Sequence, residues 1–329
     1  MRAAWFEAFG AAADVLKVGE LPDPVPGPGQ VRVRLKTSGV NPSDVKKRAG
    51  AFPNLLDLGL VVPNSDGAGV IESVGEGVNP KRVGERVWVY QAQYGRRLGT
   101  AAQYVSIEAD RAVFLPERAS FEVGACLGIP VMTAHRCVFA DGPVDGQVVL
   151  VTGGAGRVGY YAIQWAVAAG ARVIASASSP ADVDACRSVG AHHVFSHREA
   201  GWGQRVKALN GGKPVDRVID VEFGANLPEV LECIRIGGTI ATYSSTQVKE
   251  PSLPFLRMMF MDLTLRLVIV YAMPEAAKQH AIKDITSFLA EGRLQHRIAH
   301  VLPLDEIARA NELIERGGFG GCVVVDVEA

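Results

Sequence analysis

Three glycines at fixed spacing make the most specific chemical motif of the chain. Gly154, Gly156 and Gly159 fit the pattern G-x-G-x-x-G, directly after the apolar run VVLV and before a helical pattern. In such a turn the first glycine permits the tight bend, the second lets the backbone approach a pyrophosphate, and the third lets the helix pack closely on the strand. N–H groups of the first helical turn then face the phosphates. The motif predicts a dinucleotide site; the alternative is a glycine turn without a ligand.

The end of the next expected strand bears on which dinucleotide binds. An acidic residue about 20 positions after the glycines would bind the ribose 2′-OH of NAD. Here the stretch 176–179 reads SASS, which has no carboxylate and leaves room for a 2′-phosphate. Asp182 and Asp184 follow and would repel a phosphate, and the nearest cations are His197 and Arg198. We expect NADP, and the two aspartates argue against it.

The elements that must position this turn alternate between strand and helix. From Val148 onward, strand-like runs are separated by helical stretches, which predicts a doubly wound parallel sheet of the Rossmann type. The runs VVLV and RVIDV lack polar alternation, as expected for strands covered on both faces. The expected strands are 148–152, 172–176, 193–196, 216–221, 238–243 and 265–271.

The first third of the chain is β-rich and irregular. The segments 30–40, 67–75 and 83–93 alternate or cluster β-branched residues, and Gly and Pro separate them, which predicts a small β-barrel. A helical pattern starts after Ser120, a suitable N-cap. After Tyr271 we expect helices over 275–291 and 304–316 and a final strand over 322–327. That tail is placed to add strands back to the first domain.

Charge and composition exclude several classes of partner. Lys and Arg total 34 against 35 Asp and Glu, a net charge of −1, which gives no reason to expect nucleic acid or an anionic membrane. No apolar stretch is long enough for a transmembrane helix, and the start has no signal-peptide core. The 5 cysteines never form a CxxC pair. They read as reduced thiols of a cytoplasmic protein.

Taken together, several motifs resemble one family. GVNPSDVKKRAG (39–50), PNSDGAGVIESVGEGV (63–78), SFEVGACLGIPVMTA (120–134), TGGAGRVG and GAHHVFSHRE (190–199) are similar to the zinc-independent medium-chain dehydrogenase/reductases, specifically the quinone oxidoreductases related to zeta-crystallin. The resemblance covers essentially the whole chain. It implies a GroES-like catalytic domain formed by 1–122 and 272–329, and a dinucleotide-binding Rossmann domain formed by 123–271.

The resemblance also bears on whether the chain can bind a catalytic zinc ion. Zinc alcohol dehydrogenases of this family use a Cys, a His and a second Cys as catalytic ligands, and the matching places here hold Asn41, Ser65 and Ile129. None of these is a good zinc ligand. We therefore expect no zinc, and an acceptor that is already electrophilic.

Site residues follow by position from the same resemblance. Asn41, Asp44 and Lys46 would line the catalytic pocket, although an exposed lysine is the alternative for Lys46. Phe52 stands where some relatives place a Tyr that contacts substrate. Tyr94 is a further candidate, with a surface aromatic as the alternative. The cofactor contacts would be Thr133, Gly154, Ala155, Gly156, Arg157, Val158, Gly159, Ser178, His197, Asn226, Tyr243, Ser244, Ser245, Thr246, Val268, Ile269 and Val270.

The resemblance implies an NADPH-dependent quinone oxidoreductase. The alternatives are a reductase of enone, enal or enoyl-thioester double bonds and a low-turnover NADPH-binding protein of the crystallin kind. The proton donor would be Asn41, Lys46, Tyr94 or water. The β-prone run 263–271 would form an unpaired sheet edge, which predicts a homodimer through that edge.

Overall fold

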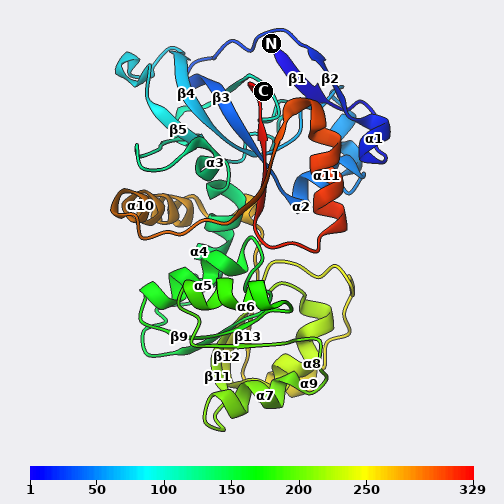
Figure 1. The fold of residues 1–329 in the computed structure, drawn as a ribbon, viewed down its shortest axis with the longest axis vertical. Coiled ribbons are helices and arrows are strands. Elements are labelled where there is room, and N and C mark those ends of the chain that lie inside the picture. The colour runs from blue at the N-terminus through cyan, green and yellow to red at the C-terminus, as the bar shows by residue number, and fades with distance from the viewer. The chain divides into compact units, whose positions relative to one another are not determined.

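The computed structural model describes residues 1–329, which form two compact units. One consists of 1–129 and 282–329, and the other of 130–281 (Figure 1). We call them the barrel unit and the sheet unit. The boundaries fall a little later in the chain than the expected ones, after Ile129 and after Ala281.

The sheet unit is built on a parallel sheet of six strands in the order β10-β9-β8-β11-β12-β13. The first strand in sequence lies at the centre and the order reverses on either side of it, which confirms the doubly wound Rossmann arrangement. Helices α5 and α6 lie on one side of the sheet, and α7 and α8 on the other (Figure 1). The strands are β8 (Val148–Val151), β9 (Arg172–Ser176), β10 (His193–Phe195), β11 (Val215–Asp220), β12 (Ile234–Thr242) and β13 (Thr264–Leu267).

The helices of this unit are α4 (Met132–Phe139), α5 (Gly159–Ala168), α6 (Pro180–Ser188), α7 (Trp202–Leu209), α8 (Phe223–Cys233), α9 (Phe255–Phe260) and the 3₁₀ turn η5 (Val270–Ala272), and α10 (Glu275–Glu291) begins here. Most of them fill the crossovers between parallel strands, whereas α4 comes before the first strand, and η5 and α10 come after the last. Leu150, Ile174 and Val218 are fully buried in the core between sheet and helices. This explains why these strands show no polar alternation in the sequence.

The barrel unit contains a seven-stranded, mostly antiparallel sheet in the order β14-β15-β3-β4-β5-β7, with β6 paired to β3. Strands β1 (Arg2–Trp5) and β2 (Lys17–Glu20) form a separate pair. The other strands are β3 (Gln30–Val40), β4 (Asp66–Val74), β5 (Arg86–Val89), β6 (Tyr104–Glu108), β7 (Ala112–Phe114), β14 (Ile298–Pro303) and β15 (Cys322–Asp326). Its helices are α1 (Ala12–Val15), α2 (Pro42–Arg48), α3 (Phe121–Gly124) and α11 (Ile307–Arg316), with 3₁₀ turns η1 (Pro53–Leu56), η2 (Pro80–Arg82), η3 (Ala109–Arg111) and η6 (Leu304–Glu306).

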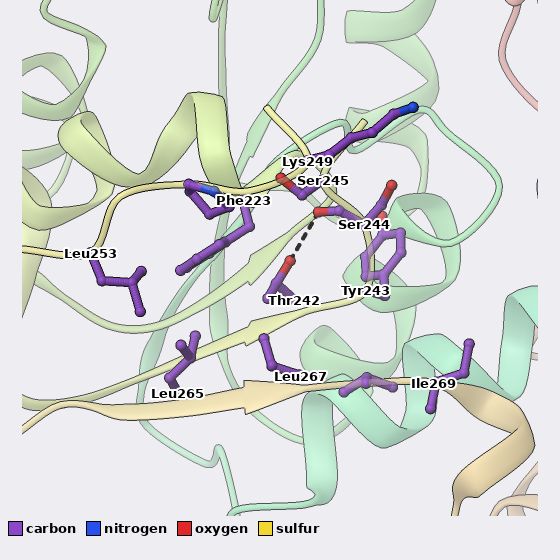
Figure 2. Close-up of a pocket in the computed structure, with 12 residues that line it drawn as sticks. Phe223, Thr242, Tyr243, Ser244, Ser245, Lys249, Leu253, Leu265, Leu267 and Ile269 are labelled. Carbon is purple, nitrogen blue, oxygen red and sulfur yellow. Dashed lines mark hydrogen bonds between the residues drawn. The ribbon is translucent and has the colours of Figure 1, made fainter. Parts of the chain in front are cut away.

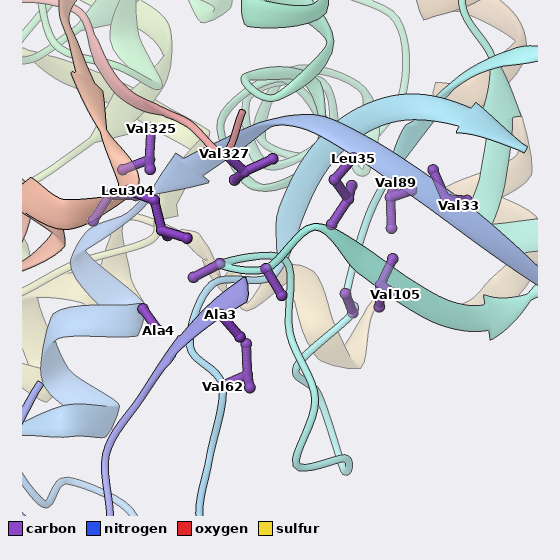
Figure 3. Close-up of a cluster of buried hydrophobic side chains, with 14 of the residues drawn as sticks. Ala3, Ala4, Val33, Leu35, Val62, Val89, Val105, Leu304, Val325 and Val327 are labelled. Atoms are coloured by element: carbon purple, nitrogen blue, oxygen red, sulfur yellow. The ribbon is translucent and has the colours of Figure 1, made fainter. Parts of the chain in front are cut away.

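The C-terminal tail completes the barrel unit, as expected. Strand β15 pairs antiparallel with β3, and β14 pairs parallel with β15. Figure 3 shows the core that this pairing creates, in which Val325 and Leu304 from the tail lie in one apolar cluster with Leu35 and Val33 of β3. Strands some 300 positions apart in the chain therefore share a single core.

The segment 120–139 was expected to be helical throughout, and it is interrupted. Ser120 caps α3 as predicted, because its hydroxyl accepts a hydrogen bond from Val123 N at 3.3 Å. A π-helical turn, η4 (Leu127–Val131), then separates α3 from α4 and contains Pro130. Proline has no N–H to bond to the preceding turn, which accounts for the break. No helix of the chain is both long and apolar enough to cross a bilayer.

Candidate active site and cofactor site

The glycine turn connects β8 to α5. Gly153 has a left-handed φ of 61°, so the bend is made by the glycine before the motif rather than by Gly154, to which the sequence had given that role. Gly154 is required for packing instead, because an added Cβ would lie 2.9 Å from Ala175 Cβ and 3.0 Å from Cys186 Sγ. The turn is therefore pressed against β9 and α6.

The other two glycines of the motif differ in how much room surrounds them. A Cβ on Gly159 would lie 2.3 Å from the carbonyl oxygen of Gly153, so only glycine lets the helix start this near the strand. A Cβ on Gly156 would meet only that same oxygen, at 3.1 Å, so its other side is open. A phosphate can approach the backbone on the open side of Gly156, at the positive end of α5. The N–H of Gly156 itself donates to Gly153 O at 2.9 Å, and that of Tyr160 donates to Gly156 O at 3.0 Å. The turn thus fits a dinucleotide pyrophosphate.

Serines at the end of β9 hold the neighbouring loop. Ser176 Oγ accepts a hydrogen bond from Gly153 N at 2.9 Å, which ties β9 to the glycine turn. Ser179 caps α6, accepting from Asp182 N at 3.2 Å and donating to Asp182 Oδ2 at 2.8 Å. The carboxylate of Asp182 is thus held at the N-terminus of α6, a favourable place for an anion. Ser178 is half-buried between these two serines.

The candidate cation for a 2′-phosphate is weakly charged. His197 is exposed, and partial desolvation, followed by the charge of Arg198, lowers the pKa of its imidazole. His197 therefore contributes a hydrogen-bonding ring more than a permanent positive charge at neutral pH.

A buried network joins the carboxyl ends of β8 and β11. Asp220 Oδ1 accepts hydrogen bonds from Thr152 Oγ1 at 2.6 Å and from Asn226 Nδ2 at 2.7 Å. Burial raises the pKa of Asp220, while the Thr152 and Asn226 hydrogen bonds oppose that shift. The amide of Asn226, an expected cofactor contact, is thus bound to Asp220 and positions the strand ends.

The loop after β12 is held by Glu222. Its carboxylate accepts from Thr246 N at 2.7 Å and from Gln247 N at 2.8 Å, and Ser245 Oγ accepts from Gly224 N at 2.9 Å. Tyr243 precedes these residues. Burial raises the pKa of its hydroxyl well above the usual value, and the nearby Arg157 guanidinium opposes that shift.

Figure 2 shows a cavity of the sheet unit, of about 450 Å³, at the ends of β12 and β13. Phe223, Leu253, Leu265 and Leu267 make an apolar side, and the serines of the loop make a polar side. Five expected cofactor contacts line it: Tyr243, Ser244, Ser245, Val268 and Ile269. A second cavity of about 270 Å³ shares Val268 and Ile269 and adds Arg136 and Arg266. Thr133 and Val270 are buried elsewhere in the same unit.

The barrel unit contains a buried polar cluster at the start of α2. Asn41 is the N-cap, and its backbone N–H donates to Asp44 Oδ2 at 2.9 Å. Its side-chain amide donates to Asp66 Oδ2 at 2.9 Å, and Ile129 N donates to the same oxygen at 2.8 Å. Two of the three expected catalytic residues, Asn41 and Asp44, therefore meet here.

Burial shifts both carboxyl groups of this cluster. It raises the pKa of Asp66 to about 8 and that of Asp44 to about 6. The second oxygen of each, Oδ1, is buried without a hydrogen-bond partner. Buried carboxyl groups in this state are typical of functional sites.

The third expected catalytic residue lies apart from the cluster. Lys46 is exposed, whereas the next residue, Lys47, is 5% exposed. The Lys47 ammonium donates to Gln93 O at 3.1 Å and to Ser65 Oγ at 3.4 Å. Asp66 and Lys47 were missed in the sequence. The helical spacing of Asp44 and Lys47, three residues apart, is the pattern that places them on one face of α2.

The remaining expected residues of this unit are on its surface. Phe52 is 50% exposed, beside η1, and Tyr94 is 47% exposed in a loop.

The residues at the three zinc-ligand places do not form a ligand set. Ile129 offers its backbone N–H to Asp66, and the Asn41 amide donates to the same carboxyl group. In the sheet unit, the imidazole rings of His135 and His280 lie with their centroids 5.1 Å apart.

Comparisons with known proteins agree with this architecture. Residues 27–117 match the alcohol dehydrogenase GroES-like domain, and residues 158–290 match the zinc-binding dehydrogenase family. Human quinone oxidoreductase is 31% identical over 320 residues, covering 96% of this chain and 94% of that protein.

Two solved structures are similar over nearly the full length. An NAD-dependent alcohol dehydrogenase is 29% identical with a TM-score of 0.85, covering 99% of this chain and all (100%) of the other. A mycobacterial protein complexed with NADPH is 26% identical with a TM-score of 0.87 and the same coverage, 99% and 100%. With a GroES-like unit, a Rossmann unit and these relatives, the chain belongs to the medium-chain dehydrogenase/reductase family and is an oxidoreductase.

Proposed function

We propose that the protein is an NADPH-dependent, zinc-independent reductase of quinones or similarly electrophilic acceptors. The observation that carries the proposal is the glycine turn open at Gly156, beside a β9 end that holds only serines and alanine. The mycobacterial structure with NADPH supports the choice of cofactor, and the human quinone oxidoreductase supports the class of acceptor.

The bound cofactor would supply a hydride, and the chain's own groups would position it. The pyrophosphate would lie against the open side of Gly156, at the positive end of α5. Ser178 would face the 2′-phosphate, with Asp182 held away by its bond to Ser179. The loop from Tyr243 to Thr246 and the backbone at Val268 would close on the cofactor's other end.

The residues at the three zinc-ligand places support an electron-poor acceptor. Zinc would polarise an unactivated carbonyl, but Asn41, Ser65 and Ile129 offer neither thiolate nor imidazole. Without that polarisation, hydride transfer requires an acceptor that is itself electron-poor, such as a quinone.

We further propose a homodimer formed through the edge strand β13. Its outer side is unpaired in the sheet, and Leu267 and Ile269 are 73% and 55% exposed. Pairing with a second copy would cover both. Sedimentation at micromolar concentration would give twice the 35.0 kDa chain mass, and a monomer mass would contradict the proposal. All five cysteines are free and buried, which supports a cytoplasmic location.

An acceptor screen tests the proposed function. We would follow NADPH oxidation with quinones, enones, enals and enoyl thioesters, before and after dialysis against a chelator, and identify each product. Hydroquinone or semiquinone formation that survives chelation supports the proposal. A saturated carbonyl product would favour double-bond reduction instead. NADPH binding without turnover on any acceptor would favour a low-turnover binding protein, and loss of activity on chelation would contradict zinc independence.

A further inference from the structure

Glu222 stands at the start of α8, but its side chain does not cap that helix. It is the N-cap residue of α8 and makes no side-chain hydrogen bond to it. Its carboxylate oxygen Oε1 accepts instead from Thr246 N at 2.7 Å and from Gln247 N at 2.8 Å. The other oxygen, Oε2, lies 3.0 Å from Thr246 N. The side chain of Glu222 therefore serves the loop after β12.

The same helix holds this loop, residues 244–248, by two further hydrogen bonds. Phe223 N donates to Ser244 O at 3.0 Å, and Gly224 N donates to Ser245 Oγ at 2.9 Å. These first N–H groups of α8 are thus satisfied by the loop and are not left for an anion. All of these contacts lie within the sheet unit.

The loop lies at the edge of the sheet where the glycine turn also lies. In the sheet, β11 alone separates β12 from β8, and neighbouring strands are about 4.8 Å apart, which gives about 10 Å between the two strand ends. In a doubly wound sheet a dinucleotide binds across the carboxyl ends of the strands. A nucleotide that extends from the glycine turn toward β12 would reach this loop, where Ser244 and Ser245 line the cavity shown in Figure 2.

Fixing the loop before the cofactor binds has a consequence for affinity. A loop that is mobile in the free protein must be ordered on binding, and the entropy lost in this way weakens the complex. Thr246 and Gln247 are exposed, so burial does little to hold them, and the carboxylate of Glu222 binds both of their N–H groups. Hydrogen bonds to a charged acceptor are the stronger kind.

We propose that Glu222 is a positioning residue that holds the loop 244–248 ready to bind the NADPH cofactor. The inference rests on the proposed function and names a residue that sets the affinity for the cofactor without touching the reacting atoms. Because Glu222 acts on binding and not on hydride transfer, its loss should raise the Kd and the KM for NADPH and leave kcat at saturating NADPH unchanged.

The test compares Glu222→Ala and Glu222→Gln with the wild type in NADPH titrations followed by nicotinamide fluorescence. Alanine removes every bond to Thr246 and Gln247, and we expect NADPH to bind at least about tenfold more weakly. Glutamine places one carbonyl oxygen at the position of Oε1, which accepts both bonds. These neutral bonds are roughly half as strong, so we expect a loss of about threefold. With an acceptor that the wild type reduces, KM for NADPH should rise in proportion and kcat should not change.

Glu229→Ala is the matched control. Glu229 lies on the same helix, and its carboxylate also accepts from two backbone N–H groups, Gly201 N at 2.7 Å and Gly203 N at 2.8 Å. These groups belong to the start of α7, which contributes none of the proposed cofactor contacts. We expect Glu229→Ala to lower the melting temperature about as much as Glu222→Ala does, and to bind NADPH as the wild type does.

Hydrogen exchange gives a readout that does not depend on activity. Without cofactor, the amide hydrogens of Thr246 and Gln247 should exchange faster in Glu222→Ala than in the wild type, because their acceptor is gone. Saturating NADPH should restore part of the protection. In Glu229→Ala the exchange of Gly201 and Gly203 should change instead.

Several outcomes would overturn the proposal. A folded Glu222→Ala with wild-type affinity would remove the positioning role, and an equal loss of affinity in Glu229→Ala would make the effect one of general stability. Tighter NADPH binding by Glu222→Ala would mean that the carboxylate acts by repelling the phosphates.

Two further results complete the test. If Glu222→Ala does not fold, Glu222→Gln decides, and wild-type affinity together with wild-type hydrogen exchange in that variant would overturn the proposal. A wild type that binds no NADPH would instead refute the proposed function, and this inference with it.

Discussion

The glycine turn of the sheet unit and the polar cluster of the barrel unit are two candidate sites that are built from different kinds of groups. Between Thr152 and Gly159 the turn offers open space beside the backbone at Gly156, at the positive end of α5. The cluster at Asn41 offers side chains, two of them carboxyl groups whose pKa burial raises. The glycine turn depends on open space beside the backbone. The polar cluster depends on where its ionisable side chains are placed.

The difference predicts how each region should respond to change. The glycine turn, which depends on open space, should be sensitive to a single added methyl group and insensitive to pH. The polar cluster, which contains buried ionisable groups, should be sensitive to pH and should tolerate substitutions of equal shape. The following variants test this contrast.

Gly159→Ala should have the largest effect on the sheet unit. The new Cβ would lie 2.3 Å from the carbonyl oxygen of Gly153, so α5 must move away from β8. Overpacking of this kind costs about 1–3 kcal/mol or more. Thermal unfolding should show the sheet unit melting several degrees lower, with NADPH binding lost. An unchanged melting temperature would show that the turn is looser than its geometry indicates.

Asp66→Asn should change the pH dependence of stability. The ordinary aspartate pKa is 3.8, and in the folded chain Asp66 titrates at about 8, so the folded state holds a proton that the unfolded state releases. The wild type therefore loses stability as pH rises between these values, by at most about 1.4 kcal/mol per pH unit. The variant cannot ionise.

Melting temperatures of wild type and Asp66→Asn, measured from pH 5 to pH 9, check this prediction. As pH rises, the melting temperature of Asp66→Asn should increase relative to that of the wild type. Asp57→Asn, on an exposed loop position, is the control and should follow the wild type at every pH. Parallel curves for Asp66→Asn and the wild type would mean that this carboxyl group ionises as freely as an exposed one.

Gly156→Ala should separate binding from folding. The added methyl meets only the Gly153 carbonyl oxygen, at 3.1 Å, so a shift of a few tenths of an ångström accommodates it. On the open side it would occupy the place of the pyrophosphate. We expect NADPH to bind about tenfold or more weakly, roughly 1.4 kcal/mol, with nearly the wild-type melting temperature. Wild-type affinity would place the pyrophosphate elsewhere.

Ser179→Ala should have the smallest effect. It removes the N-cap of α6 and one hydrogen bond to Asp182, which costs about 1 kcal/mol. Chemical denaturation measures the loss. Ser188→Ala is the matched control at the other end of the same helix, where the exposed hydroxyl donates to Ala185 O, and its effect should stay within about 0.5 kcal/mol. Equal losses would show that the cap adds nothing specific.

The same contrast explains what the sequence could reveal. The glycine turn is contiguous, so its residues and its neighbouring strands were predictable, and so was Ser120 as a cap. The role of Gly153 was not, because several glycines in a row leave open which one takes the left-handed conformation. The topology of the barrel unit could be predicted from the sequence only in part. The pairing of β15 with β3 joins segments that are distant in the chain, and no local pattern specifies it.

The polar cluster was harder to predict for the same reason. Asn41 and Asp44 lie in one segment and were expected together. Asp66 comes from another strand, and only the fold brings its carboxyl group to the amide of Asn41. Choosing Lys46 over Lys47 required knowing which face of α2 is buried, and two adjacent lysines give no periodic pattern to decide it.

A binding titration of NADPH and NADH, followed by nicotinamide fluorescence, tests the central claim most directly. The account predicts NADPH binding at least about tenfold tighter, roughly 1.4 kcal/mol, because the serine-lined end of β9 accepts a 2′-phosphate. Equal affinity, or tighter NADH, would mean that Asp182 and Asp184 govern this site and that the cofactor is misassigned. Failure to bind either would make the glycine turn purely structural and contradict the proposed reductase.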